Sequence, residues 1–259
     1  MEIIDHNKKS WEEKVKQKSR WTVPVSSEEI DRARAGDWSI VVTAEKAVPK
    51  EWFPELEGKK VLCLASGGGQ QGPILAAAGA DVTVLDFSEA QLAQDSFVAQ
   101  RDGLTIHTVL GSMTDLSMFD NESFDLIIHP VSNVFVPDIQ PVWQEAFRVL
   151  KNGGSLISGF MNPVFYLFDW ELEEKGMLQV KYSIPYSELD YSSPEEVAQN
   201  GYSLEFGHTL EQQIQGQVHA GFVIAGLYED TFGGERLIDR HISSFISTRA
   251  MKLRSLASL

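Results

Sequence analysis

Apolar and polar positions follow two different periods from residue 59 onward. Short apolar runs bounded by glycine or polar residues are typical of strands buried on both faces, and the longer segments between them repeat apolar residues at helical spacing. The predicted strands lie at 59–66, 81–86, 105–111, 124–130 and 155–160, and the first of them suits a buried parallel strand. This regular alternation predicts an α/β fold with a doubly wound parallel sheet and right-handed crossovers.

Local signals mark the ends of the helices between these strands. The predicted helices lie at 72–80, 88–103 and 141–154. Ser88 and Gln91 form a predicted capping box at the start of the second helix, and Gly103 stops it. The third helix is amphipathic, with a basic end that we expect to terminate at Gly153 and Gly154.

The alternation breaks at 162–207, which is rich in Tyr and Phe and contains three prolines. Within it, 178–187 alternates like an antiparallel strand, and 193–196 resembles one turn of capped helix. Long excursions inside compact domains usually carry function, so we interpret this segment as a substrate lid. The alternative is an extra structural hairpin.

The two ends of the chain complete the predicted architecture. The pattern over residues 1–58 predicts helices and loops, and Ser26 with Glu29 forms a predicted capping box. Near the other end, Thr209 and Gln212 cap a helix. It is followed by two strands at 222–230 and 241–252, which pair antiparallel because no helix separates them. We therefore expect a seven-stranded, mostly parallel sheet with an antiparallel C-terminal strand pair and an inserted lid.

The domain organisation follows from these segments. An N-terminal helical or lid segment spans 1–58, and one α/β domain spans 59–259 with the lid insertion at 162–207. The 259 residues, 43% of them hydrophobic, are enough for one large core.

Charge and residue counts exclude several partners. A formal net charge of −15 argues against nucleic acid, which needs clustered Lys and Arg. Cys63 is the only cysteine, so no internal disulfide or cysteine-based zinc site is expected. The six His residues show no paired ligand spacing, which makes a metal site unexpected. The first residues lack the apolar core of a signal peptide and no apolar run is long enough to cross a membrane, so we expect a cytoplasmic protein.

The glycine spacing Gly67-x-Gly69-x-x-Gly72 fits two kinds of nucleoside cofactor. It occurs in nicotinamide dinucleotide sites and in loops that approach S-adenosylmethionine, and the spacing alone does not distinguish them. In both cases an acid at the end of the second strand binds ribose hydroxyls. Asp86 is that acid. The alternative is that Asp86 only caps the following helix.

Longer blocks favour one of the two cofactors. "ESFDLIIHP" followed by "WQEAFRVLKNGGSLI" resembles the post-motif blocks of class I S-adenosylmethionine-dependent methyltransferases. Two further features agree with this family. About sixty residues precede the first strand, and the final two strands form an antiparallel pair. The resemblance covers roughly residues 58–160, with a weaker match at 208–230.

The resemblance implies a set of site residues. It places the loop from Ala65 to Gly69 against the amino-acid end of the cofactor, Phe87 beside the adenine, and His129 with Pro130 beside the reacting methyl. The implied cofactor-binding residues are Ala65, Ser66, Gly67, Gly69, Asp86, Phe87, Ser88, Gln91, Ser112, Met113 and His129.

Three positions depart from the family pattern. The family has an acid where Cys63 stands, a glycine at Ala65 and an acid at Ser112. Each lost charged hydrogen bond weakens the hold on the cofactor by roughly 1 kcal/mol. We expect compensating contacts from the N-terminal segment, with Arg20 and Trp21 as candidates.

Methyl transfer from a sulfonium is an in-line displacement, so alignment supplies most of the catalysis. A base is needed only where the nucleophile carries a proton at neutral pH, and His129 is the candidate. Alternatively, His129 orients a loop or contacts the cofactor through its backbone. Trp21, Tyr166 and Tyr182 are candidate substrate residues, although the tyrosines could equally pack within the insertion.

No basic groove or appended recognition domain is visible, which favours a small-molecule acceptor. Two other functions stay open at this point. An NAD(P)-dependent oxidoreductase would need a catalytic pair such as Tyr-x-x-x-Lys, which is absent. A noncatalytic S-adenosylmethionine-binding protein is compatible with the altered positions 63, 65 and 112.

Overall fold

The computed structural model describes residues 3–193, 196–197, 199 and 201–253. Its centre is a seven-stranded sheet in the order β3-β2-β1-β4-β5-β9-β8. The strands are β1 Lys60–Leu64, β2 Asp81–Asp86, β3 Ile106–Leu110, β4 Phe124–His129, β5 Leu150–Met161, β8 Val223–Asp230 and β9 Phe245–Met251. Neighbours from β3 to β5 are parallel, whereas β9 is antiparallel to both β5 and β8. The predicted sheet, with its antiparallel C-terminal pair, is confirmed.

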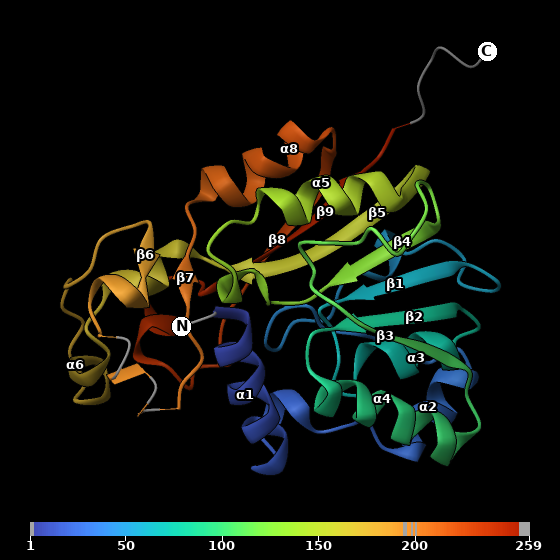
Figure 1. The fold of residues 1–259 in the computed structure, drawn as a ribbon, viewed down its shortest axis with the longest axis horizontal. Coiled ribbons are helices and arrows are strands. Elements are labelled where there is room, and N and C mark those ends of the chain that lie inside the picture. The colour runs from blue at the N-terminus through green and yellow to red at the C-terminus, as the bar shows by residue number, and fades with distance from the viewer. Residues whose placement is uncertain (1–2, 194–195, 198, 200, 254–259) are drawn as a thin grey trace.

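Helices cover both faces of this sheet (Figure 1). They are α1 Ile3–Lys16, α2 Ser27–Arg34, α3 Gln71–Ala77, α4 Glu89–Asp102, α5 Gln140–Val149, α6 Trp170–Glu174 and α8 Gly216–Ala220. Short turns of other helix types are η1 Arg20–Thr22, η2 Lys50–Trp52, η3 Asn133–Phe135, η4 Pro163–Leu167, η5 Glu188–Asp190, η6 Glu211–Gln215 and η7 Leu237–Arg240. Helices α5 and α8 lie on one face, and α2, α3 and α4 lie on the other.

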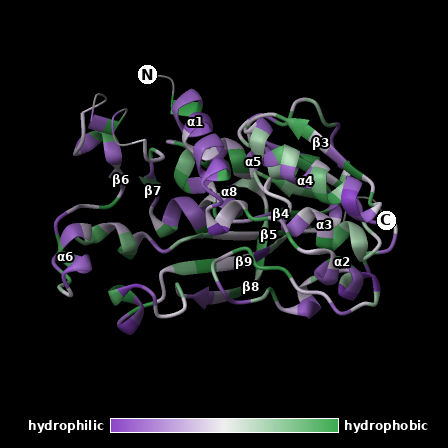
Figure 2. Ribbon diagram, turned by 90° about the horizontal axis from the view of Figure 1, so that it is seen from below, coloured by the Kyte–Doolittle hydropathy of each residue, from purple (hydrophilic) through white to green (hydrophobic). Residues whose placement is uncertain are grey.

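Two hydrophobic clusters lie on opposite sides of the sheet because successive side chains of a strand point to opposite faces. In β1, Val61 and Cys63 belong to the cluster under α2, α3 and α4. Leu62 and Leu64 belong to the cluster under α5. Figure 2 shows hydrophilic and hydrophobic residues mixed along most helices, as expected of helices with one face on a sheet.

Most of the predicted helix signals operate as expected. Ser26 and Glu29 exchange both bonds of a capping box at α2. Gly103 ends α4 in the left-handed region, with φ of 64°. Only half of the capping box predicted at α4 forms: the Ser88 side chain accepts from the Gln91 amide at 3.3 Å. The side-chain oxygen of Gln91 has no hydrogen-bond partner among the described residues.

Two predicted boundaries are wrong. The third helix ends at Val149, and the chain is already extended at Leu150, which is buried and pairs with Phe124. Gly154 lies inside β5, where a Cβ would approach the Asp125 carbonyl at 2.8 Å. The last strand begins at Phe245 rather than at 241, because the preceding residues form η7 and a turn. Tertiary pairing decides these boundaries.

The antiparallel strand predicted over 178–187 is also wrong, since only Tyr186–Ser187 (β6) is strand. It pairs with β7, Phe206–Gly207. Tyr182 and Tyr186 instead pack edge to face at 5.4 Å, in one cluster with Trp170.

The capped turn predicted at 193–196 lies partly outside the described residues, at 194 and 195. Its flanking residues Ser193 and Glu196 do exchange backbone-to-side-chain bonds of 2.8 and 3.2 Å. The predicted cap at Thr209 is present, because Thr209 Oγ1 accepts from the Gln212 amide at 3.1 Å.

Helix α1 joins the insertion to η3, in the loop after β4. The buried amide of Asn7 accepts from the Leu204 amide at 2.7 Å and donates to the carbonyls of Leu204 and Phe135 at 3.1 and 3.0 Å. Trp11 packs edge to face on Phe135 at 5.3 Å. The segment before the first strand is thus part of the packed structure. Within the described part of the chain, no helix is both long enough and apolar enough to cross a membrane.

Candidate cofactor and acceptor site

A cavity of about 290 Å³ opens where the glycine loop, the N-terminal segment, the insertion and the loop after β8 meet. It lies beside the carboxyl ends of β1, β2, β4 and β5, which is where parallel α/β sheets bind ligands. The sequence-predicted residues on its wall are Trp21, Ala65, Ser66, Gly67, Asp86, Phe87, Gln91 and Tyr166. Those not on its wall are Gly69, Ser88, Ser112, Met113, His129 and Tyr182.

The glycine loop is held tightly at its first turn. Ala65 adopts a positive φ of 47° directly after β1. At Gly67 a Cβ would lie 2.8 Å from the Gln91 Cβ and 3.0 Å from Asp86 Oδ2, so only glycine fits without a shift. Ser66 Oγ donates to Gln71 Oε1 at 3.1 Å.

Asp86 ends β2 with its side chain 5% exposed. Its Oδ2 accepts from the Gly67 amide at 3.0 Å, and its Oδ1 accepts from the Ser88 amide at 2.9 Å. Burial raises the pKa of Asp86 to about 6, although the hydrogen bonds from Ser88, Gly67 and Phe87 oppose the shift. The carboxylate thus both lines the cavity and supports the start of α4. Its remaining lone pairs leave it able to accept from a ligand hydroxyl.

His129 is fully buried and turned away from the cavity. Its Nδ1 lies 2.9 Å from the Leu64 carbonyl, and its Nε2 lies 2.8 Å from Asn133 Oδ1. Burial also lowers its pKa. With both nitrogens engaged, the ring is not placed to take a proton from a substrate. This geometry favours the alternative, in which His129 orients the loop that follows β4, and the base expected here stays a prediction.

The other predicted residues away from the wall have structural contacts. Ser88 caps α4, and the Gly69 carbonyl accepts from the Val25 amide at 2.9 Å. Ser112 Oγ lies 2.7 Å from Thr114 Oγ1, and Met113 belongs to the hydrophobic cluster under α5. Tyr182 packs on Tyr191 with ring centroids 4.7 Å apart.

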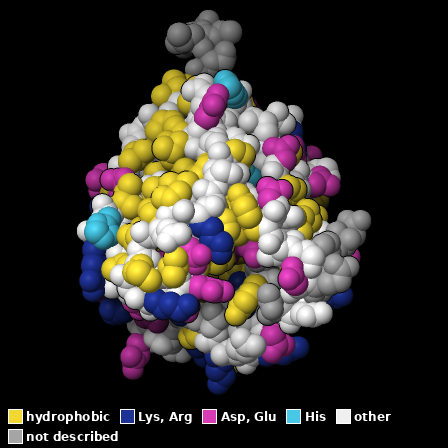
Figure 3. Space-filling model, turned by 90° about the vertical axis from the view of Figure 1, so that its left-hand side faces the viewer, with side chains coloured by type: hydrophobic (Ala, Val, Ile, Leu, Met, Phe, Trp, Pro, Cys, Tyr) yellow, Lys and Arg dark blue, Asp and Glu magenta, His cyan; other side chains and the backbone are white. Residues whose placement is uncertain are grey.

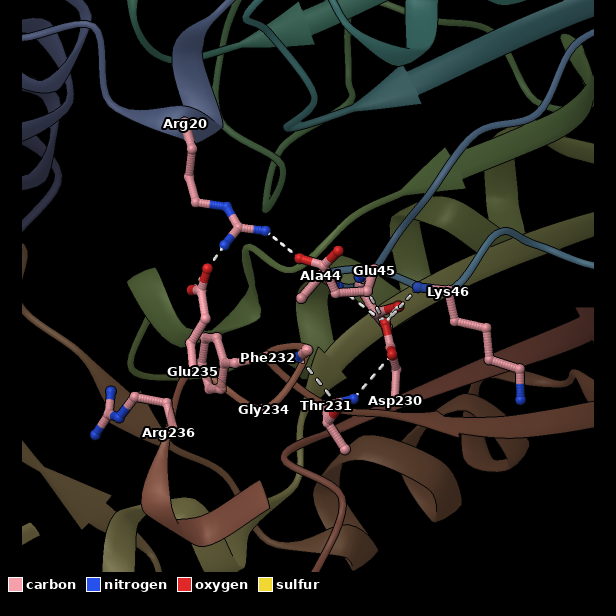
Figure 4. Close-up of polar contacts among 12 residues, drawn as sticks. Arg20, Ala44, Glu45, Lys46, Asp230, Thr231, Phe232, Gly234, Glu235 and Arg236 are labelled. Atoms are coloured by element: carbon pink, nitrogen blue, oxygen red, sulfur yellow. Dashed lines mark hydrogen bonds and ion pairs between the residues drawn. The ribbon is translucent and has the colours of Figure 1, made fainter. Parts of the chain in front are cut away.

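The two N-terminal candidates occupy different positions. Trp21 lies on the cavity wall. Arg20 lies outside it and forms ion pairs with Glu45 and, at 3.0 Å, with Glu235 (Figure 4). The Arg20 carbonyl also accepts from Gln70 Nε2 at 3.1 Å. Arg20 therefore holds the loops around the cavity together instead of lining it.

The far end of the cavity contains charged residues that the sequence did not reveal. Tyr166 is fully buried and donates to Glu205 Oε2 at 2.8 Å, and burial raises the pKa of both groups. Lys14 donates to Ser203 Oγ at 2.9 Å, and burial lowers its pKa. These residues are far apart in sequence, so no local motif could have indicated them.

Aromatic side chains surround these charges, including Trp11, Phe135, Phe165 and Phe232. Arg236 also lies on the wall and is paired with Glu173. A second cavity of about 760 Å³ shares Lys14, Glu205 and Arg236 with the first. The face that carries the insertion shows acidic, basic and hydrophobic side chains interspersed (Figure 3). Across residues 3–193, 196–197, 199 and 201–253, no group of His, Cys, Asp and Glu side chains could hold a metal ion.

Sequence comparisons identify related proteins. Residues 62–158 match a protein family described as "Methyltransferase domain". An "Uncharacterized methyltransferase YbaJ" of Bacillus subtilis (strain 168) is 57% identical over 254 residues, covering 97% of this chain and 99% of its own. A "Ubiquinone biosynthesis O-methyltransferase" of Pseudomonas syringae pv. tomato is 33% identical over 122 residues, 45% of this chain and 53% of its own. This chain thus spans only about half of that second relative.

Solved structures share the fold at low sequence identity. A putative S-adenosylmethionine-dependent methyltransferase from Listeria monocytogenes superposes with a TM-score of 0.59 and 19% identity, over 79% of this chain and 96% of its own. A Burkholderia thailandensis 1,6-didemethyltoxoflavin-N1-methyltransferase, solved with bound 1,6-didemethyltoxoflavin and S-adenosylhomocysteine, superposes with a TM-score of 0.53 and 14% identity, over 76% of this chain and 72% of its own.

Proposed function

Since this chain belongs to the class I S-adenosylmethionine-dependent methyltransferases, we propose that it is an enzyme that methylates a small-molecule acceptor by in-line displacement. The observation that carries the proposal is one cavity that joins the glycine loop and Asp86 to an aromatic far end. Membership of this family sets aside both the oxidoreductase and the noncatalytic binding protein as interpretations of the glycine loop.

The residues at the near end fit the cofactor. The side-chain oxygen of Gln91 is buried on the wall with no partner among the described residues, which leaves an acceptor for a ligand donor. In this proposal Asp86 accepts from the ribose hydroxyls, Phe87 lies beside the adenine, and the loop from Ala65 to Gly67 lies against the amino-acid end.

The far end suits an acceptor of limited size. S-adenosylmethionine supplies an electrophilic methyl group, so the protein has to align the acceptor and exclude water. Phe165 and Tyr166, from η4 after β5, and Trp21, from η1, form aromatic walls for this purpose. We propose that 1–58 and 162–207 act together as the cover of this end.

A single titration series tests the cofactor assignment. The purified protein is titrated by calorimetry with S-adenosylhomocysteine, S-adenosylmethionine and NADH in parallel. We expect micromolar binding of the two adenosyl ligands and no binding of NADH. Asp86→Asn should weaken S-adenosylhomocysteine binding by about 1–3 kcal/mol, because a buried charged acceptor is lost.

The matched control is Asp81→Asn, at the exposed start of the same strand, which should leave the affinity unchanged. Binding of NADH alone would overturn the assignment. Unchanged affinity in Asp86→Asn would remove Asp86 from the ribose site. Turnover of labelled S-adenosylmethionine with phenols, amines and carbon acid substrates then tests for a small-molecule acceptor.

A further inference from the structure

Asp95 is a buried acid that contacts the back of the glycine loop. It lies on α4, one turn after Gln91, and its exposure is 0%. Its Oδ2 accepts from the Gly68 amide at 3.0 Å, and the Gly69 amide also favours its charged form. Its Oδ1 has no hydrogen-bond partner among the described residues. The loop amides are therefore divided between two acids, with Gly67 bonded to Asp86 and Gly68 bonded to Asp95.

No cation faces this pair of acids in the part of the chain that the structure describes. The ionisable groups that influence Asp95 and its surroundings are Asp86, at the end of β2, and Cys63, in β1. Helix α3, which also packs on α4, has no ionisable residue. The charged side chains of α1, α2 and β3 are not among the groups that shift its pKa. A buried carboxylate without a counter-ion is costly, so its hydrogen bonds to the loop have to offset that cost.

The glycine loop packs closely against the turn of α4 that carries Asp95. A Cβ at Gly72 would lie 3.3 Å from Asp95 Oδ1, and one at Gly69 would lie 3.0 Å from the Gln94 carbonyl. The loop thus rests directly on the turn of α4 that carries the acid. The Gly68 amide also donates to the Gln91 carbonyl at 3.1 Å. Protonation of the Asp95 carboxyl would weaken its acceptance from the Gly68 amide and leave that amide with the Gln91 carbonyl as its acceptor, so the loop would be held less firmly.

We propose that Asp95 is a positioning residue whose ionised carboxylate holds residues 67–69 in the conformation that receives the cofactor, so that cofactor binding releases a proton. The inference rests on the proposed cofactor site. It adds support of the loop by α4 to the compensating cofactor contacts that we expected from Arg20 and Trp21.

The direction in which cofactor affinity changes with pH follows from the burial of Asp95. Burial first, and then the charge of Asp86, raise the pKa of Asp95 to about 7 against the opposing hydrogen bonds of Gly68 and Gly69. Below that pH the free protein holds a proton that the bound state releases, so affinity falls as pH falls. One such group predicts about fourfold weaker binding at pH 6.5 than at pH 8.5. Because Asp86 titrates nearby, the apparent pKa values belong to the pair.

The experiment is calorimetric titration with S-adenosylhomocysteine at pH 6.5 and pH 8.5, for the wild type and for Asp95→Asn. We expect Asp95→Asn to bind about tenfold more weakly at pH 8.5, but only about threefold more weakly at pH 6.5. The ratio of the dissociation constants of the two proteins at one pH is independent of the titration of the ligand itself, because that titration affects both constants equally. Glu89→Gln, the same change at an exposed position of α4, is the control and should follow the wild type at both pH values.

A second measurement covers the case in which Asp95→Asn does not fold. The wild type is titrated at pH 7 with 5′-methylthioadenosine, which lacks the titrating α-amino group of S-adenosylhomocysteine, in phosphate and in Tris buffer. The difference between the binding enthalpies in the two buffers gives the number of protons released per ligand bound. We expect release of about half a proton. Zero proton release, or an equal loss of affinity at both pH values, would overturn the proposal. Absence of S-adenosylhomocysteine binding by the wild type would instead refute the cofactor site itself.

Discussion

The carboxylate of Asp230, at the end of β8, attaches the loop before the sheet to the C-terminal strand pair. Its Oδ2 accepts from Thr43 Oγ1 at 2.7 Å and from the amides of Glu45 and Lys46 at 2.8 Å each (Figure 4). The side chain is 7% exposed, yet these bonds hold its pKa below the ordinary value despite the opposing effect of burial. Since Thr43 lies on the cavity wall, this carboxylate also supports the site.

Asp230→Asn should destabilise the protein by about 2–4 kcal/mol, because a charged acceptor of several donors is replaced by a neutral amide. Urea unfolding at pH 7 measures the change. Its neighbour Glu229 is exposed, and Glu229→Gln should change stability by less than about 0.5 kcal/mol.

The same substitution has a pH signature. An acid with a lowered folded pKa stabilises the protein above its unfolded pKa of about 4, and that stability is lost as pH falls through the folded pKa. The difference between wild type and Asp230→Asn should therefore shrink below pH 4. A difference that stays constant down to pH 3 would show that the charge of Asp230 is not what stabilises the loop.

At the scale of single elements, β5 lies directly beneath the chain segment that leads into the sheet. A Cβ at Gly159 would lie 1.9 Å from the Val42 carbonyl oxygen. That carbonyl accepts from the Val131 amide at 3.1 Å, so the segment cannot move away without breaking the bond. Val41 and Val131 both lie on the cavity wall, which makes this close approach part of the site.

Gly159→Ala should cost about 3 kcal/mol, because the clash is with backbone that is itself hydrogen-bonded. Gly111→Ala is the comparison, since its Cβ would lie 3.2 Å from the flexible end of Met118 and at ordinary contact distance, 3.5 Å, from Leu85 Cδ1. We expect that variant to lose less than about 1 kcal/mol. Equal unfolding midpoints for the two variants in urea would contradict the packing argument.

At the scale of the whole molecule, the net charge of −15 acts on every surface position. Like charges repel in the compact state, and salt screens this repulsion over a Debye length of about 10 Å at 0.1 M. Salt also weakens exposed ion pairs such as those of Arg20, but such pairs contribute only about 0–1 kcal/mol each.

The melting temperature should therefore rise by roughly 2–4 °C between 20 and 200 mM NaCl, a stabilisation of about 1 kcal/mol. Differential scanning calorimetry at pH 7.5 measures it, with choline chloride as a second salt to show that no specific cation is responsible. A melting temperature that falls with either salt would mean that the exposed ion pairs outweigh the net repulsion.

Some parts of the fold could be predicted from the sequence and others could not. The sheet was predictable because each strand is a local apolar run, and the helices because their caps lie within a few residues of one another. The segment 178–187 was not, since alternating tyrosines serve equally well in an aromatic cluster. The end of α5 was not either, because Leu150 becomes extended only through its pairing with Phe124.

By itself, the sequence determined the parallel sheet, the antiparallel final pair, the position of the glycine loop and the placement of Asp86 at its edge. These features depend on periodicity and on neighbours along the chain. Only the tertiary structure decided that His129 is buried, that Asp95 accepts from the Gly68 amide, and that Lys14 and Glu205 line the same cavity. The physical reason is that periodicity tells which face a side chain occupies, whereas burial and hydrogen-bond partners depend on what the fold packs against that face.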